Sequence, residues 1–107
     1  MESKWITAEG TGWITLEGFG QINPRSDGVD GGRYYFTAKT LKDEYAMARG
    51  SEITGSRETW FYELDQPFVL SDYDDNCIEV IISQLLGGRY AVRHRIVPCQ
   101  SLETGGW

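Results

Sequence analysis

The sequence predicts an α+β domain in which about six mostly antiparallel strands form a curled sheet or a small barrel, with one helix packed against it. Three observations support this prediction: a six-residue phrase that occurs twice near the start, one segment with helix-capping residues at both ends, and a Gly-Gly pair between two apolar runs. A chain of 107 residues suits a single domain over 1–107.

The repeated phrase reads Trp-Ile-Thr-Ala-Glu-Gly at 5–10 and Trp-Ile-Thr-Leu-Glu-Gly at 13–18. The spacing of eight residues is even, so each repeated residue keeps its face in an extended chain. Glycines between the copies suit a tight loop, and we therefore predict a hairpin over 4–17. Its aliphatic face is expected in the core: Ile6, Ala8, Ile14 and Leu16. Its other face is polar and aromatic: Trp5, Thr7, Glu9, Trp13, Thr15 and Glu17.

The middle of the chain contains the predicted helix, at about 40–49. The segment from Thr40 to Asp43 resembles a capping box, and Gly50 is a good helix terminator. Three apolar residues fall on one helical stripe: Leu41, Tyr45 and Ala48.

Loops and short strands surround this helix. Turn-forming residues dominate 19–33 and predict a long exposed loop. Strands are expected at 58–64 and, more briefly, at 68–70, with an acidic turn at 71–76. The end of the chain, 101–107, is expected to be a loose tail.

The last third predicts a second hairpin, over 78–97, with Gly87-Gly88 as a two-residue turn. In this register Ile81 faces His94, and Tyr90 and Val92 lie on the same core face. Three arginines form a stripe on the opposite face: Arg89, Arg93 and Arg95.

Charge and composition exclude some functions. The net charge is −6, from 16 acidic and 10 basic residues, which disfavours a nucleic-acid partner. No signal peptide is evident, and the apolar runs are far shorter than the ~20 residues of a membrane span. We therefore expect a cytoplasmic protein, in which Cys77 and Cys99 are reduced core thiols.

Candidate chemistry is sparse. Glu79 and His94 are expected to be diagonal neighbours, which suits general acid/base catalysis but equally suits a buried histidine satisfied by a carboxylate. The arginine stripe could bind an anion or pair with surplus acids such as Asp72, Asp74 and Asp75. The acidic turn lacks the Gly and Glu of a calcium loop, and no zinc-ligand spacing occurs. We expect neither a metal nor a cofactor.

Two functions remain open. The first is a small non-catalytic protein that acts through a protein–protein surface, as an inhibitor, an immunity-type protein or an accessory factor. The negative net charge would suit a partner with a basic surface. The Trp5/Trp13 face and the loop at 19–33 would make the contact, and pairing at the hairpin edge would favour a homodimer. The second is a barrel or an enzyme for a small anionic metabolite, bound by an arginine in a cavity lined by Trp60, Tyr62, Tyr90 and His94.

Overall fold

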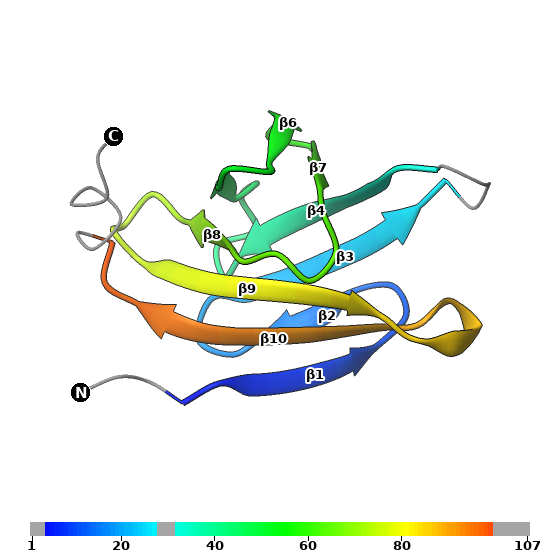
Figure 1. Ribbon diagram of the computed structural model, residues 1–107. Coiled ribbons are helices and arrows are strands. Elements are labelled where there is room, and N and C mark those ends of the chain that lie inside the picture. The colour runs from blue at the N-terminus through cyan, green and yellow to red at the C-terminus, as the bar shows by residue number, and fades with distance from the viewer. Residues whose placement is uncertain (1–3, 28–31, 100–107) are drawn as a thin grey trace.

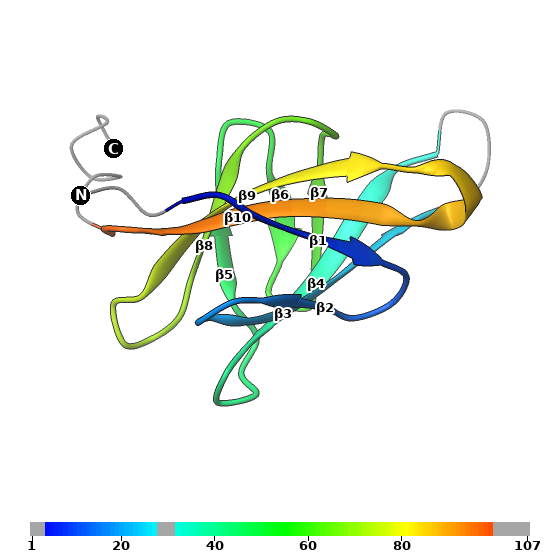
Figure 2. The same ribbon diagram turned by 90° about the horizontal axis from the view of Figure 1, so that it is seen from below.

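The computed structural model describes residues 4–27 and 32–99, which form ten strands and no α-helix. The strands make two antiparallel five-stranded sheets that lie as separate layers (Figure 1, Figure 2). The predicted α+β class is therefore wrong, because both layers of this sandwich are β-sheets.

Each sheet has a simple strand order. Across the first sheet lie β1 (Ile6–Gly10), β10 (Tyr90–Val97), β9 (Cys77–Gln84), β8 (Phe68–Ser71) and β5 (Met47–Arg49). Across the second lie β2 (Ile14–Leu16), β3 (Gly20–Ser26), β4 (Tyr34–Thr40), β7 (Thr59–Tyr62) and β6 (Thr54–Ser56). A single 3₁₀ turn, η1 (Leu86–Gly88), lies between β9 and β10.

The core lies between the sheets, where alternate residues of every long strand point inward. Phe36 of β4 stacks on Phe68 of β8 with ring centroids 4.9 Å apart, so aromatic contacts join the two layers. Tyr62 of β7 packs against both rings. Aliphatic side chains surround this cluster and are fully buried: Leu16, Ile22, Leu70, Ile78, Val80, Ile82 and Val92.

The predicted hairpin over 4–17 is wrong, because the two copies of the phrase belong to different sheets. Ile6 of β1 lies opposite His94, whereas Ile14 of β2 lies opposite Ile22. Both copies still direct their isoleucines toward the space between the layers. The alternation of apolar and polar residues in the phrase requires only that the isoleucines face the core. It does not specify which strand each copy pairs with.

The outward faces of the two copies consequently lie on opposite sides of the sandwich. Figure 2 shows β1 and β2 in separate layers. Trp5, Thr7 and Glu9 lie on the outer side of the first sheet, while Trp13, Thr15 and Glu17 are exposed on the second.

The predicted helix at 40–49 is a tight turn followed by β5. The Thr40 hydroxyl accepts hydrogen bonds from the backbone N–H groups of Lys42 and Glu44, as a helix cap would. Asp43, however, has φ of 61°, and the Thr40 N–H donates to the Glu44 carbonyl, so the chain reverses. Burial then alternates along 45–49 with the period of a strand.

The predicted loop at 19–33 contains β3. Pro24 made this segment look unlike a strand, yet Pro24 lies opposite Phe36 in the β3–β4 ladder. The neighbouring β2 pairs only with Gly20–Ile22, so no ladder donor is needed from Pro24 on that side. Residues 28–31 of the loop and the predicted tail at 101–107 lie outside the described residues.

The second hairpin forms, but β9 is shifted by one residue. Tyr90 lies opposite Gln84, and a five-residue loop closed by a bond from Leu85 N–H to the Arg89 carbonyl (2.8 Å) replaces the predicted two-residue turn. This slip exchanges the faces of β9, so Ile81 is only half-buried. The inward residues of β10 are as predicted: Tyr90, Val92 and His94.

A disulfide joins Cys77 to Cys99, with their Cα atoms 5.3 Å apart. Cys77 opens β9 and lies opposite Val97 at the end of β10, so the chain brings Cys99 beside it two residues later. The expectation of reduced thiols is therefore wrong. Two cysteines 22 positions apart carry no signal of proximity until the strand register is known.

Candidate functional site

The predicted acid/base pair is not assembled. Glu79 lies on the outer face of β9 and forms an ion pair with Arg95 (2.9 Å). His94 lies on the inner face of β10 and is only 1% exposed. The two side chains therefore point to opposite sides of the first sheet.

Both ring nitrogens of His94 are used within the protein. Nε2 accepts a hydrogen bond from the backbone N–H of Glu17 (3.2 Å), and Nδ1 lies 3.1 Å from the Val92 carbonyl. Since Nε2 is an acceptor, the neutral ring carries its proton on Nδ1 and donates it to Val92. His94 thus connects β10 of the first sheet to the end of β2 in the second.

The predicted cavity residues are packed in the core: Trp60, Tyr62, Tyr90 and His94. Trp60 donates its indole N–H to the Ala46 carbonyl (3.3 Å). The hydroxyl of Tyr62 is buried and has no hydrogen-bond partner among the described residues. Burial, aided by nearby Tyr90, raises the pKa of Tyr62 far above its ordinary value.

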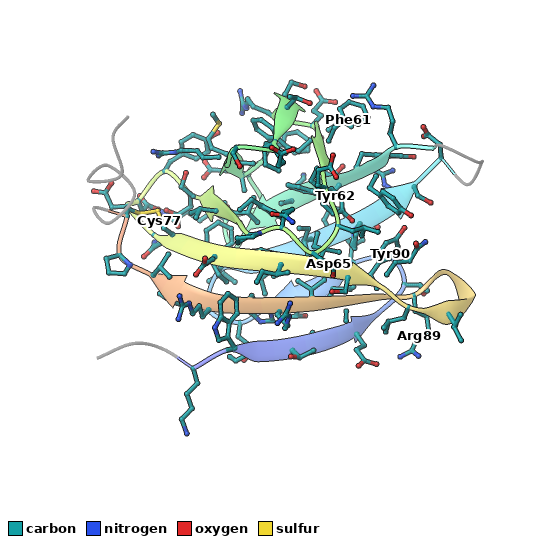
Figure 3. The ribbon with its side chains drawn as sticks, in the orientation of Figure 1. Phe61, Tyr62, Asp65, Cys77, Arg89 and Tyr90 are labelled. Atoms are coloured by element: carbon teal, nitrogen blue, oxygen red, sulfur yellow. A yellow bond between two sulfur atoms is a disulfide. The ribbon has the colours of Figure 1, made fainter. Side chains whose placement is uncertain are left out.

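Two residues of the arginine stripe pair with carboxylates of neighbouring strands. Arg89 contacts Glu9 of β1 (2.9 Å), and Arg95 contacts Glu79 of β9. Figure 3 shows Arg89 at the β9–β10 turn, far from Cys77 at the other end of β9. Arg93 lies on the outer face between these pairs and is exposed.

The acidic turn binds its own backbone. The Asp72 carboxylate accepts hydrogen bonds from the N–H groups of Asp74 and Asn76 and from the Asn76 side chain. Burial acts to raise the pKa of Asp72, but these hydrogen bonds outweigh it and the pKa lies below its ordinary value. Asp74 in turn pairs with Lys42 (2.7 Å). No cluster of three metal-type side chains occurs among the described residues.

An exposed apolar surface lies where β1 begins and β10 ends. We call it the edge patch and define it as Trp5 and Arg95, on the outer face of the first sheet, together with Ile6 and Ile96, whose side chains lie on its inner face at the same end. Trp5 is 39% exposed, and Ile6 and Ile96 are each 42% exposed. The Arg95 guanidinium lies 4.5 Å from the centre of the Trp5 ring.

Contacts with neighbouring strands hold the side chains of the edge patch in place. Arg95 reaches over Trp5 while its ion pair with Glu79 fixes it from the next strand, so one row of side chains spans β1, β10 and β9. Ile96 reaches toward Gly18 in the turn between β2 and β3, where an added β-carbon would lie 3.8 Å from the Ile96 side chain. The sequence pattern indicates the exposure of Trp5, but it does not indicate that of Ile96, because Ile96 has the same strand parity as the buried Val92 and His94.

Within the described ranges, no helix is long and apolar enough to cross a membrane. The chain matches no protein-family model, no curated protein and no solved structure. The functional argument therefore depends on the residues of the edge patch and of the surrounding sheets.

Proposed function

We propose that the protein is a non-catalytic recognition domain that binds an extended segment of another protein along β1, over the edge patch. The observation that carries this proposal is the exposed Trp5 ring, which is fixed by Arg95 and Glu79 on the outer face at the start of β1, while two exposed isoleucines lie on the inner face at the same end.

The chemistry of the edge patch suits protein binding. Trp and Arg dominate the energetics of protein interfaces, and an anchor that is already ordered costs less entropy to bind. Ile6 and Ile96 expose further apolar area on the inner face of the same strand end, so an added strand at β1 could contact apolar side chains on both of its faces. Since Glu79 neutralises Arg95, the patch offers apolar contact without an unpaired buried charge.

The backbone of β1 supplies the second part of the argument. In the described part of the chain β1 pairs with β10 alone, so its other side is a strand edge. An extended peptide can add to such an edge through main-chain hydrogen bonds, while pockets between side chains select its sequence. The net charge of −6 favours a basic partner and disfavours nucleic acid.

The disulfide indicates the kind of cellular compartment in which the protein would bind its partner. Disulfides persist in oxidising compartments and are rare in the cytosol. The Cys77–Cys99 bond therefore supports a location in an oxidising compartment, in place of the cytoplasm expected from sequence.

A photo-crosslinking residue at Thr7 tests the proposal, with Thr15 as its matched control. These are the same position of the two copies of the phrase, and both are exposed. We expect a crosslinked partner from Thr7 that disappears in the Trp5→Ser variant, and none from Thr15. Equal crosslinking at both positions would contradict the proposal.

The mass of the crosslinked product identifies the occupant. A second copy of the chain, joined across a two-fold axis at β1, would appear as a dimer in light scattering and would lose that mass in Trp5→Ser. A product that contains a different protein supports the proposal as stated.

A further inference from the structure

A groove of 470 Å³ opens on the second sheet, near the β7–β6 end of its strand order, whereas β1 belongs to the first sheet. The pairing of β6 with β7 ends where Thr54 lies opposite Phe61, and the groove lies where the two segments separate. Its lining includes three charged side chains, two aliphatic hydroxyls and two tyrosines: Arg33, Glu52, Glu63, Ser51, Thr54, Tyr34 and Tyr62.

Arg33 is fixed by an aromatic ring. Its guanidinium lies 3.7 Å from the centre of the Phe61 ring, and Phe61 in turn lies against Tyr35, with centroids 6.0 Å apart. Among the described residues no carboxylate lies within ion-pair distance of Arg33. Stacking on a ring holds the guanidinium plane while its N–H groups stay available at the rim.

A carboxylate occupies the neighbouring position. Tyr34 lies opposite Tyr62 in the β4–β7 ladder, so continuing this register by one residue places Glu63 beside Arg33. Glu63 is exposed and, in the described ranges, belongs to no ion pair. The stacking on Phe61 thus keeps a cation and an anion on one groove wall without pairing them.

We propose that this groove binds a small zwitterion of the amino-acid type, with the ligand carboxylate on Arg33 and the ligand ammonium on Glu63. A simple anion on Arg33 would meet the carboxylates of Glu52 and Glu63, and a simple cation would meet Arg33. A ligand with both charges satisfies both partners through charge-assisted hydrogen bonds. The volume of the groove is that of a small-molecule site.

Titration of the isotope-labelled protein with L-lysine, followed by amide chemical shifts, tests this proposal. We expect saturable shifts at Arg33, Phe61 and Glu63, with a dissociation constant in the range of about 1 mM or below. Cadaverine, which is lysine without its carboxylate, and hexanoate, which has no amine, are each expected to bind at least about tenfold more weakly.

Two variants and one control assign the contacts. Arg33→Met retains an apolar chain over Phe61, and Glu63→Gln removes one charge; each is expected to weaken L-lysine binding by about tenfold. Arg25→Met is the control, because Arg25 likewise lies over a ring on this sheet, 4.8 Å from the centre of Tyr35, and is expected to leave binding unchanged.

Several outcomes would overturn the proposal. They are the absence of saturable shifts, shifts that map elsewhere, cadaverine or hexanoate binding as tightly as L-lysine, or equal losses in the Arg25→Met control. Since β1 is not part of the groove, these results are independent of the crosslinking at Thr7.

Discussion

The two copies of the repeated phrase have nearly the same residues and different environments. Ile14 of the second copy is 5% exposed, whereas Ile6 of the first is 42% exposed. Both side chains point toward the space between the sheets, but Ile6 lies at an end of the sandwich that the described chain covers only in part. Alternation therefore determines the direction of a side chain, and the opposite layer determines its burial.

The one substitution within the phrase follows the same rule. The fourth residue is Leu16 in the second copy, where it is fully buried, and Ala8 in the first, where the site is only half-buried. A larger side chain thus fills the deeper position of the core, while the shallower position on the edge strand holds a small one.

The strongest test of this comparison replaces the matched isoleucines. Ile14→Ala is expected to lower the free energy of unfolding by about 2–5 kcal/mol, because it leaves a cavity in packed surroundings. Ile6→Ala is expected to cost less than about 1 kcal/mol, since half of its surface is already in water. Urea denaturation measures both, and equal losses would contradict the comparison.

The hydrogen bond between His94 and the backbone of Glu17, which connects the two sheets, gives a second test. His94→Leu leaves the Glu17 N–H without its acceptor, and we expect a loss of about 1–3 kcal/mol in the free energy of unfolding. Arg93→Ala, on the outer face of the same strand, serves as control and should stay within about 0.5 kcal/mol. A His94 variant as stable as the control would show that this hydrogen bond does not hold the second copy in place.

The two tryptophans sharpen the comparison at the surface. Trp5→Ala removes the contact with Arg95 and is expected to cost about 0.5–1 kcal/mol in thermal or urea unfolding. Trp13, which is 46% exposed, is expected to cost less when replaced by Ala. If Trp13→Ala lowers the free energy of unfolding more than Trp5→Ala does, then Trp13, and not Trp5, is the tryptophan that is held by its contacts.

Repeating the unfolding measurements at decreasing pH separates the contribution of titrating groups, such as Asp72, from that of the isoleucines. Because the folded-state pKa of Asp72 is lowered, its contribution is present above its unfolded pKa and is lost as pH falls through its folded pKa. Asp72→Asn should thus cost a few tenths of a kcal/mol near neutral pH, with screening included, and progressively less below about pH 4. The difference in unfolding free energy between Ile14→Ala and Ile6→Ala should stay the same at every pH. A difference that changes with pH would show that titrating groups contribute to it.

Part of the fold follows from sequence alone. The inward face of β10 was predictable because Tyr90, Val92 and His94 alternate with one small residue, Ala91, and two arginines, Arg93 and Arg95. In β9, consecutive apolar residues from Val80 to Ile82 fit either register, so the length of the loop decides which face is buried. Sequence does not specify that loop, since Gly87 and Gly88 permit both a short and a longer turn.

The remaining errors have one physical origin. Thr40 offers its hydroxyl to the backbone in the same way at a helix start and in the turn that occurs here, so a local pattern cannot separate them. The disulfide and the edge patch depend on residues that are distant in sequence, such as Glu79 beside Arg95. Only the three-dimensional pairing of strands brings such residues together.

The disulfide makes the β9–β10 hairpin a closed covalent ring. The bond lies at one end of the two strands, and Leu86, which is 94% exposed, lies at the other end in η1. A protease that cuts at this tip would open the ring without releasing a fragment, because Cys77 and Cys99 still join the two halves. The nicked molecule would keep β9 and β10 as covalently linked neighbours until a reductant reaches the bond.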